Sequence, residues 1–282
     1  MFTLNCKGRL LVIDKPLVMG VVNVTHDSFY PGSRIGNDKE LLNYVEKSIH
    51  DGADFIDIGG QSTRPNADEI TPDEELKRVI TPLDLLSRQF PEILLSIDTF
   101  HSQVAAEAIA AGASVINDVS GGMKDSNILS VAAQNKAPFI CMHMKGTPKT
   151  MQLSPQYENV VEEVLDYFVG RLEACKRAGI NDVIIDPGFG FGKNSIHNFG
   201  LLKNLSVFKE LDKPILIGVS RKSTISRILG VTVNEALNGT TVLNTIALLN
   251  GAQILRVHDV KEAKQAIRIF TEYADAPSPA LS

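Results

Sequence analysis

The sequence predicts an α/β protein whose parallel strands close into a single (β/α)8 barrel. Short apolar runs alternate with helical patterns along the whole chain, which is typical of parallel strands that are covered on both faces. No change in composition divides the 282 residues, and a barrel of this kind takes roughly 250 residues. An open, doubly wound sheet is the alternative, and it would place ligand residues on only some of the strands.

The chain is expected to open with a short β-hairpin, Phe2–Ile13, that turns around Asn5–Gly8. We expect this hairpin, within residues 1–16, to cap a barrel formed by residues 17–274, followed by a flexible tail at 275–282. The barrel strands are short runs rich in β-branched residues. They are predicted at Leu17–Val22, Phe55–Ile58, Ile93–Ile97, Ser114–Ile116, Phe139–Met142, Val183–Ile185, Ile215–Val219 and Ile254–Val257.

Helical patterns fill the segments between these strands. Several of them end in a glycine just before the next strand, as at Gly52, Gly112, Gly179 and Gly251, which is a common stop signal for a helix. The helices are predicted at Lys39–Asp51, Pro72–Phe90, Gln103–Ala111, Ile128–Gln134, Tyr157–Ala178, Asn198–Lys209, Asn238–Leu249 and Val260–Tyr273.

Composition excludes several classes of partner. The net charge of −5 and the pI of about 5.7 give no overall basic field that would attract nucleic acid. No apolar stretch reaches the roughly 18 residues that a membrane span needs, and no secretory signal is present, so a cytoplasmic protein is expected. The three cysteines form no CxxC motif and predict small buried residues in a reducing compartment.

Polar side chains follow every predicted strand. In barrels the catalytic face lies at the carboxyl ends of the strands, so these residues are expected to converge on one site. The opposite strand ends mostly follow Gly-Ala or Lys-Pro turns. The polar ends are Asn23, Gly59–Pro65, Asp98–Thr99, Asn117–Asp118, His143, Asp186, Ser220–Ser223 and Arg256–Asp259.

The stretch Asp182–Asn194, DVIIDPGFGFGKN, carries Asp186 from a buried strand into a glycine-rich turn. Its glycines allow a ligand to approach the backbone, and Phe189 and Phe191 add flat apolar surface. The spacing matches neither a P-loop nor the GxGxxG dinucleotide pattern. A tight turn that binds nothing is the alternative interpretation.

Two kinds of polar residue are expected at this site. Asp98, Asn117 and Asp186 suit a flat heterocycle with an amidine-like or guanidine-like edge, and Lys222 can offset their charge. Asp and Asn at such positions are otherwise helix caps or turn formers, the role we favour for Asp118. The second kind is cationic and suits an anion such as phosphate, unless its members form surface ion pairs: Arg64, Arg221, Arg256 and His258.

Eight segments, in order, closely resemble the dihydropteroate synthase family, the pterin-barrel enzymes of folate biosynthesis. These segments are MGVVNVTHDSF, GGQSTRP, SIDT, IND, MHMKGTPKTM, DPGFGFGKN, GVSRKS and RVHDV. The resemblance implies a (β/α)8 barrel that joins 4-aminobenzoate to 6-hydroxymethyl-7,8-dihydropterin diphosphate. The products would be 7,8-dihydropteroate and diphosphate, with Mg²⁺ assisting, and the family is typically homodimeric.

The resemblance also implies roles for individual residues. It assigns catalysis to Asp98, Asp186, Lys222 and Arg256, and pterin binding to Asp98, Asn117, Met142, Asp186 and Lys222. It assigns the diphosphate to Asn23, Arg64, Arg256 and His258, with Asn23 also a ligand of Mg²⁺. It assigns 4-aminobenzoate to Thr63, Pro65, Phe191, Lys222 and Ser223.

Departures from the family pattern fall in two loops, Val24–Asn37 and Ser62–Thr71, which are candidate lids. They are His26, Tyr30-Pro31-Gly32-Ser33, Gln61 and Asn66, and none lies among the pterin residues. Gln61 directly precedes the second loop and stands where the family commonly has Glu. Two other functions stay open. A methyl-transferring pterin barrel acting on a corrinoid protein would have little need for Arg64 and Arg256. A non-catalytic pterin-binding partner should have lost loop or diphosphate residues.

Overall fold

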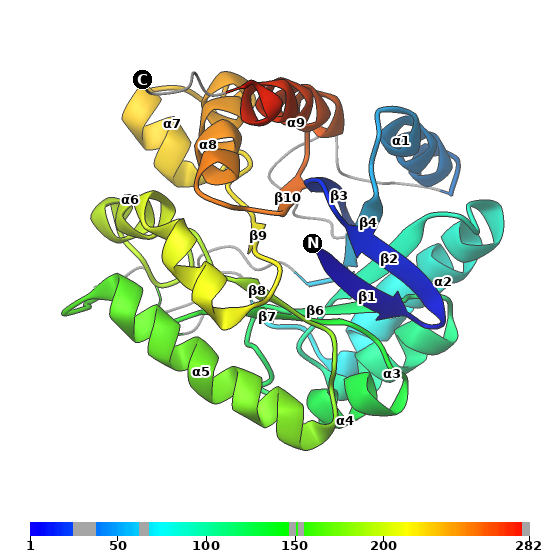
Figure 1. Cartoon of the computed structure of the whole chain (residues 1–282). Coiled ribbons are helices and arrows are strands. Elements are labelled where there is room, and N and C mark those ends of the chain that lie inside the picture. Colours follow the sequence, from blue (N-terminus) through cyan, green and yellow to red (C-terminus); the bar gives the residue numbers. More distant parts are fainter. Residues whose placement is uncertain (25–37, 62–67, 147–150, 152–154, 278–282) are drawn as a thin grey trace, which may run out of the picture.

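The computed structural model describes residues 1–24, 38–61, 68–146, 151 and 155–277, and its main sheet confirms the predicted barrel (Figure 1). Eight parallel strands run in the order β8-β7-β6-β5-β4-β3-β10-β9. A parallel bridge between Ile185 and Ile215 joins the two end strands and closes the ring. The strands are β3 (Leu17–Asn23), β4 (Phe55–Gly59), β5 (Leu94–Asp98), β6 (Val115–Asp118), β7 (Phe139–Met142), β8 (Val183–Asp186), β9 (Leu216–Ile217) and β10 (Ile254–Val257).

Helices surround this ring, and their boundaries follow local capping signals. Thr71 and Glu74 form a capping box at the start of α2, and Asn159 caps α5, which ends at Gly179 with a φ of 90°. The helices are α1 (Asp38–His50), α2 (Pro72–Gln89), α3 (Ser102–Ala110), α4 (Asn127–Gln134), α5 (Val160–Ala178), α6 (Ser195–Lys203), α7 (Ser223–Leu229), α8 (Leu237–Leu249) and α9 (Val260–Asp275).

Three details differ from the sequence prediction. The helix expected at Asn198–Lys209 is α6 followed by a separate 3-10 helix, η2 (Leu205–Leu211), and α6 begins earlier because Asn194 caps it. The short helix α7 was not predicted, because it spans only Ser223–Leu229 and directly follows the polar end of a strand. The tail expected at 275–282 begins at the last residue of α9, and residues 278–282 lie outside the described part.

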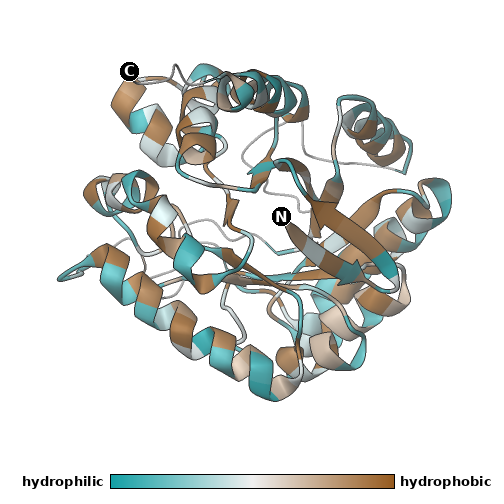
Figure 2. Ribbon diagram, in the orientation of Figure 1, coloured by the Kyte–Doolittle hydropathy of each residue, from teal (hydrophilic) through white to brown (hydrophobic). Residues whose placement is uncertain are grey.

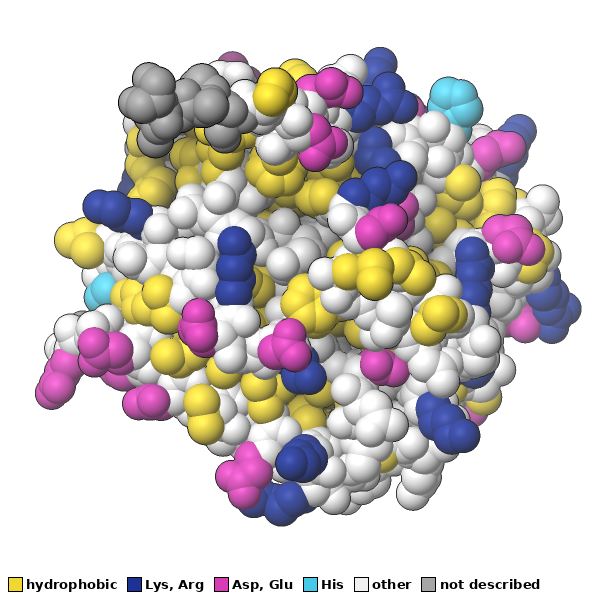
Figure 3. Space-filling view, viewed as in Figure 1, with side chains coloured by type: hydrophobic (Ala, Val, Ile, Leu, Met, Phe, Trp, Pro, Cys, Tyr) yellow, Lys and Arg dark blue, Asp and Glu magenta, His cyan; other side chains and the backbone are white. Residues whose placement is uncertain are grey.

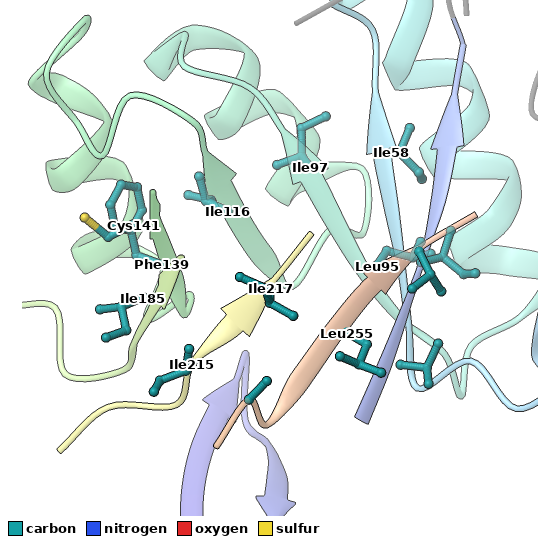
Figure 4. Close-up of a cluster of buried hydrophobic side chains, with 14 of the residues drawn as sticks. Ile58, Leu95, Ile97, Ile116, Phe139, Cys141, Ile185, Ile215, Ile217 and Leu255 are labelled. Atoms are coloured by element: carbon teal, nitrogen blue, oxygen red, sulfur yellow. The ribbon is translucent and has the colours of Figure 1, made fainter. Parts of the chain in front are cut away.

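Side chains alternate between the two faces of the ring. Those that point outward, such as Ile58, Ile97 and Ile116, form one large core with the surrounding helices (Figure 4). Figure 2 shows the same division as apolar strands inside helices whose exposed turns are hydrophilic. This packing of strands against helices fixes the position of each strand in the ring.

The hairpin of β1 (Phe2–Cys6) and β2 (Arg9–Ile13) lies over one end of the ring (Figure 1). Its buried residues Leu4, Cys6 and Ile13 share a second apolar cluster with inward-facing residues from the beginnings of the barrel strands. That cluster includes Met19, Phe55, Leu94, Val115, Ile140, Ile184, Leu216 and Ile254. The amino-terminal end of the barrel is thus filled by apolar side chains, which leaves the carboxyl end for chemistry.

The face shown in Figure 3 carries no large area of one charge sign among its described residues, and the cysteines are buried, as the sequence predicts. In Figure 3, Lys and Arg side chains are interspersed with Asp and Glu over the face viewed. Cys6, Cys141 and Cys175 are all buried and free. Among the described residues, none of the helices combines the length and the apolar character that crossing a membrane would require.

Candidate active site at the carboxyl end of the barrel

The inward-facing side chains change from apolar to polar toward the carboxyl ends of the strands. Asp98 is paired in register with Gly59 on one side and with Asn117 on the other, and Met142 is paired with Asp186. Asn23 is in register with Gly59, next along the ring. The ladder therefore pairs the predicted pterin residues in two sets at the carboxyl end of the barrel. Asp98 pairs with Asn117, and Met142 pairs with Asp186 two residues further along, because Asn117 is in register with Ile140.

Arg256 lies within this polar layer and is paired with two carboxylates. Its Nη2 donates to Asp98 Oδ2 at 2.7 Å, and its Nε donates to Asp57 Oδ2 at 2.7 Å. Asp57 Oδ2 also accepts a hydrogen bond from Asn117 Nδ2 at 2.9 Å. The sequence interpretation grouped Arg256 with cationic residues that suit an anion. The structure places its guanidinium beside the carboxylates of Asp57 and Asp98.

Asp57 is a member of this network that sequence reasoning missed. It is fully buried in the middle of β4, and its Oδ1 has no hydrogen-bond partner among the described residues. The available signal was a carboxylate inside the otherwise apolar strand FIDIG, because a buried acid needs a partner. Asp57 fixes both Arg256 and Asn117, so it orients two residues of the predicted site.

Burial raises the pKa values of Asp98 and Asp186 in this layer. Burial, together with the charges of Asp57, Asp118 and Asp186, raises the pKa of Asp98 to about 7 despite the neighbouring Arg256. Burial also raises the pKa of Asp186, against the opposing effect of Lys222. Each acid is thus poised to gain from a ligand that supplies N–H donors or positive charge.

Asp118 and Asp186, the last residues of β6 and β8, differ in how many hydrogen bonds their carboxylates accept from the backbone. Asp118 accepts from the amides of Ser120 and Gly122, both at 2.7 Å, which confirms its prediction as a turn former. Asp186 Oδ1 accepts from Gly188 N at 2.8 Å. Asp186 therefore also shapes its turn.

Lys222 lies opposite Asp186 and precedes α7. Its Nζ donates to the carbonyl oxygen of Phe189 and lies 4.5 Å from the centroid of the Phe191 ring. Burial lowers the pKa of Lys222 to about 8, although the charge of Asp186 opposes the shift. Phe191 packs against the small cluster that contains Met142. The structure thus gathers Met142, Asp186, Phe191 and Lys222, while Ser223 is exposed at the start of α7.

Of the other predicted cationic residues, Arg221 pairs with a carboxylate and His258 lies beside a hydroxyl group. Arg221 is buried and binds both carboxylate oxygens of Asp259, at 2.8 and 2.7 Å, so it forms an internal ion pair rather than part of a cationic rim. His258 Nδ1 lies 3.0 Å from Ser220 Oγ, and burial lowers the pKa of this imidazole to about 4. His258 is therefore neutral near pH 7. Thr63, Arg64 and Pro65 lie outside the described residues, as do most residues of the two predicted lids.

A family model described as pterin binding enzyme matches residues 19–258, which is most of the barrel.

The chain belongs to this pterin-binding enzyme family.

Its relatives within the family are dihydropteroate synthases, so the chain is a transferase of that group. It is 41% identical over 268 residues to the dihydropteroate synthase of Escherichia coli, covering 94% of each chain. It is 39% identical to that of Haemophilus influenzae, covering 97% of this chain and 99% of the relative.

Solved structures of the family agree with the barrel as a whole. A dihydropteroate synthase from Yersinia pestis in a sulfonamide drug complex superposes with a TM-score of 0.93 at 40% identity, over 98% of this chain and 100% of that one. The enzyme from Xanthomonas albilineans in complex with 7,8-dihydropteroate superposes with a TM-score of 0.84 at 34% identity, over 98% and 99%.

Gln61, one of the departures from the family pattern, lies within the described residues, and its side chain makes two hydrogen bonds to the backbone. Gln61 is buried, its Oε1 accepts from Ile70 N at 3.1 Å and its Nε2 donates to Asp68 O at 3.2 Å. A glutamate at this place could accept but, when ionised, could not donate. The amide therefore joins the end of β4 to the segment that leads into α2. His26, Tyr30–Ser33 and Asn66 lie outside the described residues.

Proposed function

We propose that this chain condenses 6-hydroxymethyl-7,8-dihydropterin diphosphate with 4-aminobenzoate to give 7,8-dihydropteroate and diphosphate. The observation that carries this proposal is the buried polar layer of Asp98, Asn117 and Asp186, at the ends of β5, β6 and β8, together with Lys222, whose charge interacts with Asp186. A pterin presents an aminopyrimidine edge with several N–H donors and acceptors. Two carboxylates and an amide match that edge better than they match a simple sugar or an aliphatic acid.

The pterin ring is expected to bind with its donor edge toward the acids. Arg256 holds the Asp98 carboxylate through a 2.7 Å ion pair, and Asp57 holds Arg256 in turn. These contacts fix the direction of the acceptors before substrate arrives, which is the preorganisation that makes polar sites effective. Lys222, adjacent to Asp186, can then act on a ring nitrogen or carbonyl oxygen of the bound pterin.

The reacting bond is the methylene carbon–oxygen bond of the pterin diphosphate. The diphosphate leaves with the bonding electron pair while the arylamine nitrogen forms the new carbon–nitrogen bond and afterwards loses a proton. The dihydropterin can share positive charge at the methylene, so departure can run ahead of attack. No strong base is needed, because the arylamine is already neutral. We assign the leaving diphosphate to Asn23, Arg64, Arg256 and His258.

Mg²⁺ is part of this proposal. Among the described residues no group of three His, Cys, Asp or Glu side chains is placed to hold a metal, so a dedicated protein cage is absent there. The Asn23 side-chain oxygen points to the space beside Gly59 and Asp98. One neutral oxygen fits Mg²⁺ that takes its other ligands from diphosphate and water. When bound, the ion would neutralise charge on the leaving group.

The arylamine is assigned to the opposite side of Lys222. Phe191 supplies an aromatic face there, and Ser223 is exposed at the start of α7. Thr63 and Pro65 are assigned to the same subsite from the resemblance. This places the amine between the pterin methylene and the residues that follow β8 and β9.

We further propose that the protein acts in the cytoplasm as a homodimer. Its three free, buried thiols fit a reducing compartment. The helices α7, α8 and α9 pack side by side and expose several large apolar side chains, which a second copy of the chain could cover. These side chains are Ile228, Leu229, Val242, Leu249, Ile269 and Tyr273.

The test is to incubate the purified protein with the pterin diphosphate, 4-aminobenzoate and Mg²⁺, and to follow both products. The proposal predicts 7,8-dihydropteroate and diphosphate in equal amounts. Pterin binding in calorimetry without turnover would instead favour a non-catalytic pterin-binding protein. Methyl transfer to a corrinoid protein without diphosphate release would favour the methyltransferase alternative.

A further inference from the structure

Lys193 is a buried lysine that the reaction described above does not use. It directly follows the glycine-rich turn after β8, and it is only 2% exposed. Four acceptor atoms surround its Nζ: His143 Nδ1 at 2.8 Å, Phe191 O at 3.0 Å, Gly188 O at 3.1 Å and His143 O at 3.4 Å. Burial lowers the pKa of Lys193 well below its ordinary value. A buried lysine nitrogen is unfavourable unless acceptors converge on it, so this convergence indicates a specific role.

His143 is the one side chain among these acceptors. Burial, with the charge of Lys193 adding to it, lowers the pKa of the imidazole to about 2, so the ring is neutral and its Nδ1 accepts from the lysine. Tyr167 meets the ring edge-on, with 4.8 Å between centroids. The His143 amide donates to Asp186 O at 2.9 Å. Lys193 therefore links the segment after β7 to the turn after β8.

The two segments touch through their backbones, which explains two of the glycines. Gly188 and Gly192 have φ values of 71° and 64°, and a Cβ at either one would collide with the carbonyl oxygen of His143 or of Lys145. On the other side of the turn, Asn198 Oδ1 accepts from Gly190 N at 2.7 Å. The backbone of the turn is thus held from both sides, with Lys193 Nζ on the side of β7.

What the turn holds is the arylamine side of the proposed site. The carbonyl oxygen of Phe189 accepts a hydrogen bond from Lys222 Nζ. The centroid of the Phe191 ring lies 4.5 Å from Lys222 Nζ. Lys193 binds the Phe191 carbonyl oxygen, so it fixes the backbone that carries this ring. If Lys193 Nζ were removed, the Phe191 carbonyl oxygen would lose this donor. Among the described residues, the backbone of Phe191 would then keep only the hydrogen bond from its amide to Gly188 O at 3.1 Å, whereas Lys222 would keep its attraction to Asp186.

We propose that Lys193, through its contacts with His143 and the glycine-rich turn, is a positioning residue that sets the arylamine subsite. Its Nζ touches neither substrate and acts through the backbone of Phe191. This inference rests on the proposed function, because it needs an arylamine substrate to be measured.

The test is steady-state kinetics of Lys193→Met, with both substrates varied. Methionine is unbranched and only one atom shorter than lysine, so the substitution fills most of the same space while removing Nζ and its hydrogen bonds. We expect the KM for 4-aminobenzoate to rise about tenfold, equivalent to ~1.4 kcal/mol of binding, while the KM for the pterin diphosphate changes less than about threefold. The matched control is Lys203→Met, because Lys203 is an exposed lysine at the end of α6. It should leave both constants unchanged.

A second pair of variants covers the case in which Lys193→Met does not fold. His143→Asn offers an amide oxygen near the position of Nδ1 and should keep the KM for 4-aminobenzoate near that of the unmodified protein. His143→Leu removes the acceptor and should raise it. Unchanged constants in Lys193→Met, an equal rise in both, or equal arylamine KM values in the two His143 variants would overturn the inference. Absence of dihydropteroate from the unmodified protein would instead overturn the proposed function.

Discussion

Arg256 and Asp98 form an ion pair across the carboxyl end of the barrel, with 2.7 Å between Nη2 and Oδ2. The same guanidinium binds Asp57 through Nε at 2.7 Å, and Asp57 is fully buried. A salt bridge at this depth contributes little net stability, but it fixes the direction of each charge. The pair therefore sets the acceptor geometry on which the proposed pterin site depends.

Asp57→Asn tests this supporting role. The change keeps the shape of the side chain but removes the charge that Arg256 and Asn117 both face. A hydrogen bond to a charged group contributes about 1.5–3 kcal/mol, so kcat/KM for the pterin diphosphate should fall about 10–100-fold. Steady-state kinetics measure this, with Asp84→Asn, an exposed acid paired with Arg88, as the control. Equal activity in the two variants would show that Asp57 does not support the site.

The acidic limb of the pH profile should report Asp98. Its pKa is raised to about 7 by burial, so below that pH the carboxyl is protonated and cannot accept N–H bonds as an anion. We expect kcat/KM for the pterin diphosphate to fall as pH drops below about 7, approaching tenfold per pH unit. Asp98→Asn should lower activity at every pH and remove this limb. An unchanged limb in that variant would assign it to another group.

The alkaline limb of the pH profile of kcat/KM for the pterin diphosphate should report Lys222, because burial lowers the pKa of this lysine to about 8. Above that pH the lysine is neutral, so its charge no longer acts on the bound pterin. Lys222→Met should reduce kcat/KM by about 10²-fold near pH 7, the loss typical of one preorganised donor. The variant should also lose the alkaline limb, whereas Lys203→Met should retain it. A Lys222→Met profile with the limb intact contradicts the assignment.

Arg221→Met separates an ion pair from an anion ligand. Because Arg221 is buried against Asp259 and the carbonyl oxygens of Val233 and Asn234, its removal leaves an uncompensated carboxylate. The free energy of unfolding should fall by about 3–5 kcal/mol in urea titration. Arg88→Met, which breaks an exposed pair with Asp84, should change it by less than about 0.5 kcal/mol. Unaltered stability with weakened diphosphate binding would restore Arg221 to the anion site.

Sequence reasoning placed the strands, most helices and the polar strand ends, because period, glycine stops and capping residues act locally. It missed Asp57 and the function of Lys193, because each depends on partners far away in the chain: Arg256 lies 199 residues from Asp57, and His143 lies 50 from Lys193. It grouped Arg221 with the cationic residues for the same reason, since its partner is Asp259 at another strand end. Residue type alone does not tell which buried charge is already paired.

The most direct test of the account is kcat/KM for the pterin diphosphate in Asp186→Asn, measured together with the free energy of unfolding. Asparagine keeps the oxygen that accepts from Gly188 N, so the turn is preserved while the carboxylate charge is lost. The account predicts a fall of at least about 100-fold, with unfolding free energy within ~1 kcal/mol of the unmodified protein. Near-normal kcat/KM in a folded Asp186→Asn protein would contradict a pterin site built on the inward-facing polar layer.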